Sequence, residues 1–457
     1  MRRTNVRVRG RGFAAMLLAA GVVAVSGATP AAAESIRENQ WHLDAMKAPE
    51  IWKISKGQGV TVAVIDSGFK FDHPDLAGQL LPGKDFSGLP GGVGSFTESH
   101  GTEMAALIAG SGKGMGGGGA YGLAPGAKVL PIKIRNNDNA TNVTSSDFLK
   151  QIDQGIIYAA DQGAKVISIS QARSAVSVTA EDLAELKAAV DHAAAKGALV
   201  VAGVGNSAQS GNPIEYPAAS PGVIGVGAVD RNGTVTAESE QGPQVDLAAP
   251  GIEMYNACTG ASGYCKGHGT SYSTAIVSAS AALLWSVHPD WSANQIARVL
   301  INTAGKPTDG SNRNDIVGYG IVRPRVALTE PGDPGPADVY PIQEQPVGQP
   351  APTASSAPSA TPSASASAPA SAAPVPAPGE TGTPVPQQQP VGEKDSGSGS
   401  VVPVVVAVVV GLVLVAAVVV VVVRRRAARP QQAAAGVVPP PPSYGPPNPP
   451  SDNPYAR

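Results

Sequence analysis

The stretch VTVAVIDSG, Val60 to Gly68, is almost wholly apolar until it reaches Asp66. Similar β-branched runs bounded by glycine recur along the chain: AKVLPIKI (127–134), AKVISIS (164–170), ALVVAGVGN (198–206) and GVIGVGAV (222–229). Such runs are typical of strands that are buried on both faces. Segments with helical spacing alternate with several of them: 145–163, 180–197, 273–288 and 292–305. The alternation predicts an α/β fold with a mainly parallel central sheet and helices on both faces.

Four polar residues stand at the ends of these elements. Asp66 ends the first run, His100 begins the helical segment HGTEMAALIAG, Asn206 ends ALVVAGVGN, and Ser271 opens a helical run to 287. Each alone has an ordinary structural interpretation, such as a turn residue or a helix N-cap. In a parallel sheet, however, function gathers at the carboxyl ends of the strands.

Taken together, the four residues supply the parts of nucleophilic acyl transfer. That reaction needs a hydroxyl, an imidazole to take its proton, a carboxylate to orient the imidazole, and a donor for the oxyanion. The order Asp, His, Ser is the triad order of subtilisin.

The surrounding motifs resemble those of the subtilisin-family serine proteases over residues 41–328. VAVIDSG with FDHPDL, SHGTEMAALIAG, VVAGVGN and GTSYSTAIVSA are similar to the family's aspartate, histidine, oxyanion-asparagine and serine motifs. The resemblance implies a subtilisin-like three-layer fold and a serine endopeptidase acting on protein or peptide substrates. It makes Asp66 the orienting carboxylate, His100 the general base, Ser271 the nucleophile and Asn206 an oxyanion donor.

Two further histidines, His268 and His73, lie near these motifs. His268 belongs to a second His-Gly-Thr triplet, but it lies three residues before Ser271 at a variable position and is expected in a loop. His73, in the His-Pro-Asp stretch, is expected to be structural. The sequence holds no His-Glu-x-x-His motif or cysteine-histidine ligand spacing, so no cofactor and no catalytic metal are expected, while structural calcium is left open.

The chain also departs from the family pattern. Tyr272 to Ala275 reads YSTA where the family usually has Met-Ala-x-Pro, and Ser170 to Ala172 reads SQA where the family often has Ser-Leu-Gly. Activity level and side-chain preference therefore do not transfer from the resemblance.

The two ends of the chain predict export and anchoring. Residues 1–33 have the layout of a signal peptide, and their apolar run is short for the alternative of a membrane anchor. Residues 401–423 lack charge and would form a helix of roughly 34 Å, enough to cross a membrane as one transmembrane helix. Arginines follow at once, which places the tail (424–457) in the cytoplasm and the protease domain on the other side of the cell membrane.

Composition divides the remaining chain. Residues 34–59 form an N-terminal extension, 60–330 the protease domain, and 331–400 a stalk rich in Pro, Ala and Ser that cannot bury a core. The Pro-rich tail is interpreted as solvated rather than as a docking motif. A net charge of −2 provides no basic field for nucleic acid.

This layout is similar to that of the mycosins, the membrane-anchored subtilisin-like proteases of type VII secretion systems. The resemblance implies an extracytoplasmic endopeptidase associated with a type VII secretion membrane complex. It also implies that the N-terminal extension packs against the protease domain. The alternative is a subtilisin-like scaffold of such a complex with weak or absent hydrolysis.

The only two cysteines, Cys258 and Cys265, lie in NACTGASGYCKGHGTS, shortly before Ser271. Export to an oxidising compartment favours a disulfide between them over the alternative of free buried thiols.

Overall fold

A seven-stranded sheet forms the centre of the computed structural model, which describes residues 35–135, 143–342 and 455. The strand order is β2-β3-β1-β4-β6-β8-β9, and every pairing in this sheet is parallel. The strands are β1 (Thr61–Asp66), β2 (Lys84–Asp85), β3 (Lys128–Lys133), β4 (Val166–Ile169), β6 (Leu199–Gly203), β8 (Val223–Val229) and β9 (Leu247–Pro250). The predicted parallel α/β fold is confirmed, and β2 and β9 are additions to it.

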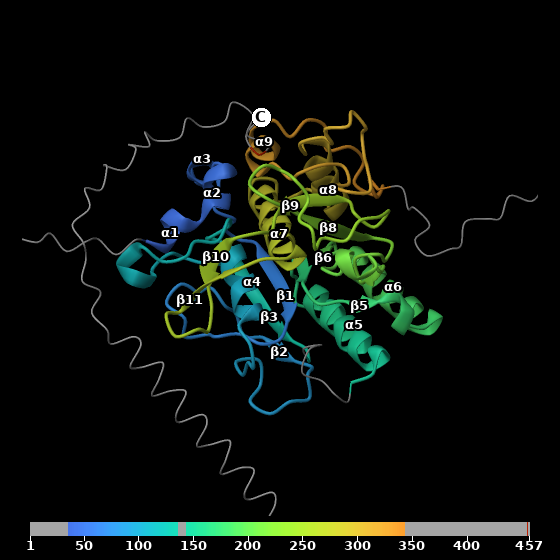
Figure 1. Ribbon diagram of the computed structural model, residues 1–457, viewed down its shortest axis with the longest axis horizontal. Coiled ribbons are helices and arrows are strands. Elements are labelled where there is room, and N and C mark those ends of the chain that lie inside the picture. Colours follow the sequence, from blue (N-terminus) through green and yellow to red (C-terminus); the bar gives the residue numbers. More distant parts are fainter. Residues whose placement is uncertain (1–34, 136–142, 343–454, 456–457) are drawn as a thin grey trace, which may run out of the picture. The chain divides into compact units, whose positions relative to one another are not determined.

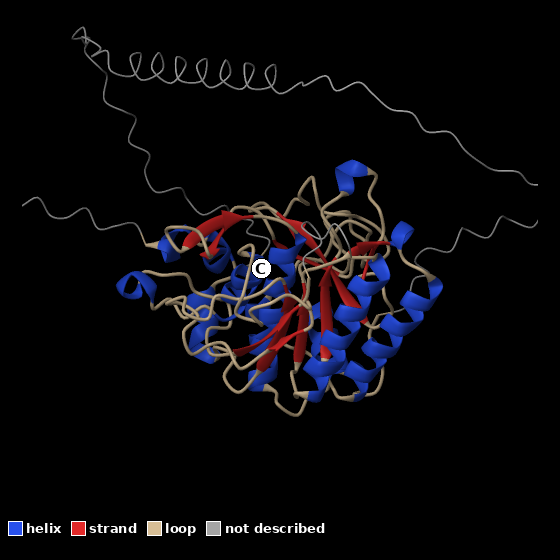
Figure 2. Cartoon of the chain, turned by 90° about the horizontal axis from the view of Figure 1, so that it is seen from below, coloured by secondary structure: helices blue, strands red, loops and turns tan. Residues whose placement is uncertain are grey.

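Helices cover both faces of the sheet, as Figures 1 and 2 show. One face carries α4 (His100–Ala109), α7 (Thr270–Val287) and α8 (Ala293–Asn302), and the other carries α5 (Ser145–Asp161) and α6 (Ala180–Ala195). Successive residues of β1 alternate between the two cores, because side chains of a strand point to opposite faces. Val62 and Val64 join the first core, and Ala63 and Ile65 join the second.

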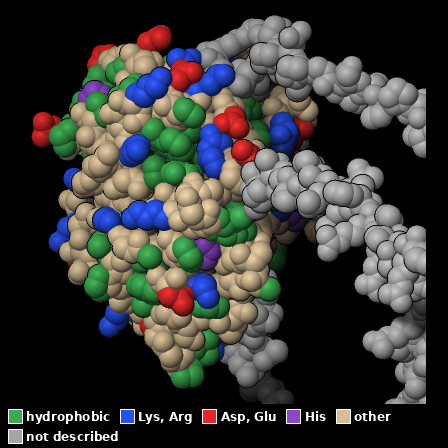
Figure 3. Space-filling model, turned by 90° about the vertical axis from the view of Figure 1, so that its left-hand side faces the viewer, with side chains coloured by type: hydrophobic (Ala, Val, Ile, Leu, Met, Phe, Trp, Pro, Cys, Tyr) green, Lys and Arg blue, Asp and Glu red, His purple; other side chains and the backbone are tan. Residues whose placement is uncertain are grey.

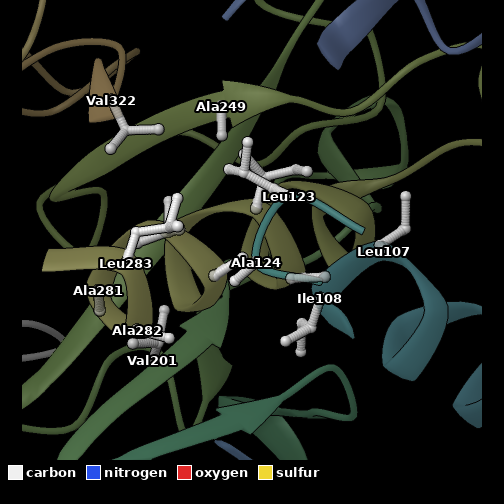
Figure 4. Packing of buried hydrophobic residues seen from close by; sticks show 14 of the residues in the cluster. Leu107, Ile108, Leu123, Ala124, Val201, Ala249, Ala281, Ala282, Leu283 and Val322 are labelled. Carbon is white, nitrogen blue, oxygen red and sulfur yellow. The ribbon is translucent and has the colours of Figure 1, made fainter. Parts of the chain in front are cut away.

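Helix α7 is almost wholly buried. Of its 18 residues, the 16 from Thr270 to Trp285 are buried. Its small side chains let neighbouring elements approach closely. Figure 4 shows Ala281 to Leu283 of α7 near Val201 of β6, with Leu107 and Ile108 of α4 in the same cluster. Helix α7 therefore packs against the sheet.

Helix starts follow from local sequence. Thr144, Thr179 and Ser292 precede α5, α6 and α8, and each side chain accepts a hydrogen bond from a backbone N–H of the first turn. Helix α7 begins differently, after Gly269 at φ +120°, which has no side chain to cap the helix. It starts at Thr270, so Ser271 is its second residue and not an N-cap.

Shorter elements complete the described chain. Two antiparallel pairs lie outside the main sheet, β5 (Arg173–Ser174) with β7 (Glu215–Tyr216) and β10 (Met254–Ala257) with β11 (Tyr264–Gly267). The remaining helices and 3-10 turns are α1 (Ile36–Asn39), α2 (Trp41–Ala45), α3 (Ala48–Ile54), α9 (Pro324–Thr329), η1 (Gly114–Gly117), η2 (Ala175–Ser177) and η3 (Ala208–Ser210).

The N-terminal helices α1 to α3 are tied to the rest of the domain by hydrogen bonds. The Gln40 amide donates to the carbonyl oxygens of Tyr121 (2.8 Å) and Tyr255 (3.1 Å). The indole of Trp41 donates to Ile252 and that of Trp52 to Leu123. These residues are absent from the lining of the cavity described below, so the segment leaves that cavity open.

The packed part of the chain extends beyond residue 330, the boundary expected from composition. Arg298 of α8 donates to the carbonyl oxygens of Pro334 and Pro336, and Gln295 donates to that of Gly335. Tyr455 is also buried, against Trp41, and its hydroxyl donates to the carbonyl of Asp230.

Within the described ranges, no helix has the length and apolarity needed to cross a membrane. The predicted signal peptide and the predicted span at 401–423 lie outside those ranges. On the face shown in Figure 3, basic and acidic side chains are interspersed with apolar ones, and no large patch carries charge of only one sign.

Candidate active site

Asp66 is the last residue of β1, the strand at which the order of strands along the chain changes direction across the sheet. β3 lies on one side of β1 and β4 on the other, which is where α/β sheets place their ligand sites. The Asp66 side chain is fully buried. Its Oδ1 accepts hydrogen bonds from the backbone N–H (2.7 Å) and the hydroxyl (3.1 Å) of Ser67, which fix the carboxylate in place.

His100 is the first residue of α4, and its ring faces this carboxylate. His100 Nδ1 lies 2.9 Å from each of Asp66 Oδ1 and Oδ2. Gly101 permits the approach, because a Cβ there would lie 2.5 Å from the Gly68 carbonyl oxygen and 3.1 Å from Asp66 Cβ. When Nδ1–H donates to Asp66, Nε2 is left as the basic nitrogen.

Ser271 lies in the first turn of α7 and is 7% exposed. Its hydroxyl donates to the carbonyl oxygen of Ser170 at 3.4 Å, and the Ser170 hydroxyl donates back to the Ser271 carbonyl at 3.3 Å. His100 and Ser271 line the same cavity of about 590 Å³, at the carboxyl ends of β4 and β6. Hydrogen bonds between a nucleophile and its base are often absent from unliganded sites and form when substrate binds.

Asn206 follows β6 and lines the same cavity. Its Oδ1 accepts a hydrogen bond from the Thr270 backbone N–H at 2.8 Å. This bond orients the side-chain amide, so that its N–H groups are available as donors. The backbone N–H of Ser271 belongs to the first turn of α7 and has no acceptor within the helix. Two donors therefore belong to residues that line the cavity, Asn206 and Ser271 itself.

The charge state of His100 follows from its neighbours. Burial disfavours the charged imidazole, but the Asp66 carboxylate outweighs burial, with contributions from Glu98 and Glu103, and raises the pKa of His100 to about 9. Only the neutral imidazole can accept a proton from Ser271. Alkaline pH therefore favours the neutral imidazole of His100, the form that can act as a base.

The subtilase family model matches residues 57–320, more than half of the chain. The chain belongs to the subtilase family. Members of this family are serine endopeptidases, and this subtilase is one as well.

Two curated relatives and two solved structures show how similar the chain is to known subtilases. It is 35% identical to thermitase of Thermoactinomyces vulgaris over 58% of this chain and 88% of thermitase. It is 31% identical to mycosin-1 of Mycobacterium tuberculosis over 68% of this chain and 78% of mycosin-1. MycP1 from Mycobacterium smegmatis superposes with a TM-score of 0.57 at 30% identity, covering 67% and 88% of the two chains. A chain of the periplasmic assembly from the ESX-5 inner membrane complex superposes with a TM-score of 0.55 at 29% identity. The match covers 69% of this chain and 90% of that chain. These similarities make the subtilase a relative of the mycosins.

The second His-Gly-Thr triplet of the subtilase has a different environment from the first. His268 lies in the loop between β11 and α7, as the sequence predicts, and its side chain is 65% exposed. Its Nδ1 pairs with the Glu238 carboxylate at 2.8 Å and 2.9 Å. His73 is buried, and its Nε2 lies 2.8 Å from the Gly263 carbonyl oxygen, which fits the expected structural role.

Replacing His268 by alanine is expected to leave the hydrolysis rate within about twofold of the wild-type rate, because an exposed ion pair contributes little. His100→Ala, in contrast, removes the candidate base. Initial rates on a peptide substrate, measured for both variants side by side, check this difference. A loss in His268→Ala as large as that in His100→Ala would overturn the assignment of the base.

The cysteines are joined as predicted. The Cys258–Cys265 disulfide, with Cα atoms 5.7 Å apart, links the end of β10 to β11. It closes the hairpin from which the chain passes through His268 into α7. The bridge therefore braces the segment that leads to Ser271.

Opening this ring is expected to affect the loop more than the domain. The chain-entropy model gives about 2.5 kcal/mol for a ring of roughly eight residues, which corresponds to a few degrees in Tm for a domain of this size. The double variant Cys258→Ser/Cys265→Ser should lose hydrolysis rate and resistance to cleavage between 258 and 265 while Tm falls by only about 4–5 °C. Limited proteolysis and thermal melting measure the two effects. A large fall in Tm with an unchanged rate would contradict the prediction.

The sequence did not indicate every residue at the site. Gln171 donates from Nε2 to Asp66 Oδ1 at 3.4 Å, and Arg173 and Glu215 line the cavity. Gln171 was visible in the sequence only as a departure from the family's Ser-Leu-Gly. Arg173 and Glu215 belong to two-residue strands, which carry no periodicity that could reveal them.

Proposed function

We propose that this subtilase is a membrane-anchored, extracytoplasmic serine endopeptidase in which Asp66, His100 and Ser271 are the triad and Asn206 is an oxyanion donor. The observation that carries the proposal is the bond of Asp66 to His100 Nδ1 at 2.9 Å in a cavity that Ser271 and Asn206 also line. A buried carboxylate that fixes one imidazole nitrogen leaves the other to act as a base.

The mechanism follows from these positions. Ser271 Oγ attacks the carbonyl carbon of the peptide bond while His100 Nε2 takes the hydroxyl proton. Asp66 holds the imidazole ring and stabilises the imidazolium that forms. The oxyanion accepts hydrogen bonds from the Asn206 amide and the Ser271 backbone N–H. His100 then donates the proton to the leaving amine, and water, deprotonated by His100, releases the acyl group from Ser271.

A fluorophosphonate probe tests this assignment, because it forms a bond only with an activated serine. The full-length protein in detergent is treated with the probe, and its peptides are mapped by mass. The proposal expects the probe on Ser271 of the wild-type chain and a loss of labelling in His100→Ala. A folded wild-type protein that takes up no probe would contradict the endopeptidase mechanism.

The membrane part of the proposal rests on the sequence. It consists of a signal peptide at 1–33, a Pro-rich stalk before 401, a span at 401–423 and a cytoplasmic tail. Association with type VII secretion is supported by the similarity to mycosin-1 and to a chain of the ESX-5 assembly. The contact of Tyr455 with Trp41 stands against the cytoplasmic tail, because it needs both residues on the same side of the membrane.

Cysteine labelling decides between the two placements of the tail. Ser451→Cys should be protected from a membrane-impermeant maleimide in intact cells and react after lysis. The matched variant Ser398→Cys, in the stalk, should react in intact cells. Labelling of Ser451→Cys before lysis would place the tail with the protease domain and reject the proposed topology.

A further inference from the structure

Two buried side chains connect α4 and α7 beside the candidate active site. Glu103 lies three residues after His100 in α4, and Tyr272 directly follows Ser271 in α7. Glu103 is 7% exposed and Tyr272 is 5% exposed. The Tyr272 hydroxyl donates a hydrogen bond to Glu103 Oε2. One hydrogen bond therefore joins the helix that carries the candidate base to the helix that carries the candidate nucleophile.

The second oxygen of Glu103 is engaged as well. The Ser99 hydroxyl donates to Glu103 Oε1 at 2.6 Å. Ser99 immediately precedes His100, and its hydroxyl makes this bond instead of capping α4. The three residues form a continuous bridge from the residue before His100 to the residue after Ser271.

The surroundings are shaped to receive the tyrosine. A Cβ at Gly267, at the end of β11, would overlap the Tyr272 hydroxyl, so the absence of a side chain there makes room for the phenol. Burial and the charge of Glu103 raise the pKa of Tyr272 far above its ordinary value, which keeps the phenol protonated and able to donate. Tyr272 stands where the family's serine motif usually has methionine, which has no hydroxyl to donate.

We propose that the Ser99–Glu103–Tyr272 bridge positions His100 relative to Ser271. The inference rests on the proposed roles of His100 and Ser271. Glu103 and Tyr272 act through those two residues and are positioning residues. The charges that raise the pKa of His100 against the effect of burial are those of Asp66 from β1, Glu98 from the preceding loop and Glu103 from α4. Tyr272 of α7 brings a neutral donor.

Two conservative variants separate the effect of the hydrogen bond between the helices from the effect of the Glu103 charge. Tyr272→Phe keeps the ring and removes the bond between the helices. Glu103→Gln keeps an acceptor for Tyr272 and removes the negative charge. The readout is the rate at which the full-length protein reacts with the fluorophosphonate probe, measured from pH 6 to pH 10, with thermal melting to establish that each variant folds.

Tyr272→Phe should lower the plateau labelling rate by about tenfold with little change in the pH midpoint, because sub-ångström misplacement of reacting groups is costly. Glu103→Gln should move the midpoint of labelling to lower pH by about half a unit to one unit, because losing a nearby negative charge lowers the pKa of an imidazolium. Because one change removes the bond and the other removes the charge, the double variant should show both effects, a plateau rate about tenfold lower and a midpoint at lower pH.

Tyr264→Phe is the matched control. Burial and the Asp75 carboxylate raise the pKa of Tyr264, as burial and Glu103 do for Tyr272, but neither Tyr264 nor Asp75 lines the cavity with His100 and Ser271. Its labelling rate and pH midpoint should equal those of the wild-type protein.

The bridge is overturned if the wild-type protein is labelled while folded Tyr272→Phe reacts at the same rate and the midpoint of Glu103→Gln does not move. If the wild-type protein itself is not labelled, the proposed function fails and the positioning role fails with it. Should Tyr272→Phe not fold, Ser99→Ala removes the other arm of the bridge, and a wild-type plateau rate in that variant overturns the proposal.

Discussion

Ser271→Ala is expected to lower the rate of peptide hydrolysis by on the order of 10⁶-fold, the loss that follows removal of the nucleophile from a serine–histidine–aspartate unit. The hydroxyl oxygen of Ser271 is the atom that would form the acyl bond, and Ser271 lines the same cavity as His100. Alanine suits a buried helix, so the variant should fold. Hydrolysis of a fluorogenic peptide and thermal melting provide the measurement.

Ser278→Ala is the matched control for this change. Ser278 lies in the same helix, and its buried hydroxyl has no hydrogen-bond partner within the described part of the chain. Its removal should leave hydrolysis and melting close to those of the wild-type protein. Retained hydrolysis in Ser271→Ala would exclude this serine as the nucleophile.

Ser271→Ala also distinguishes the endopeptidase function from the scaffold alternative. If the main role is proteolysis, cells that carry Ser271→Ala should accumulate uncleaved exported proteins although the protein is present in normal amount. A scaffold role predicts normal export and processing in that strain and a defect only when the whole protein is deleted. Comparing exported proteins from the two strains by mass spectrometry distinguishes these outcomes.

Asn206→Ala is expected to lower kcat by roughly 100 to 1000-fold with KM within about twofold, the effect of removing one oxyanion donor. The donor stabilises charge that exists only in the transition state, so substrate binding is spared. Steady-state kinetics on a peptide substrate gives both constants.

Asn206→Asp refines this experiment. Aspartate keeps an oxygen that can accept the Thr270 N–H, as Asn206 Oδ1 does at 2.8 Å, but it has no amide donor. The aspartate variant should therefore lose as much kcat as the alanine variant, or more because of its charge. A nearly normal kcat in Asn206→Asp would mean that Asn206 serves only to cap α7.

Much of the fold was predictable because buried parallel strands have a composition of their own. β1, β3, β4, β6 and β8 all fall within the predicted β-branched runs. β2 and the antiparallel pairs were not predicted, since they are only two to four residues long and depend on a partner strand for their definition. The start of α7 was misjudged by one residue because Gly269, and not a polar side chain, precedes it.

The sequence by itself determined which residue types stand at the element ends, and in which order, because local motifs such as VAVIDSG and GTSYSTA specify both the strand or helix and the polar residue at its end. Only the tertiary structure decided which of them meet. The bond from Asp66 to His100 spans 34 residues, and that from Tyr272 to Glu103 spans 169. Such contacts depend on how the helices pack on the sheet, and an (i, i+4) pattern or a motif carries no information about a partner so distant in the chain. The physical reason is that side-chain pairing across the core is set by the packing of whole elements, which local sequence patterns do not encode.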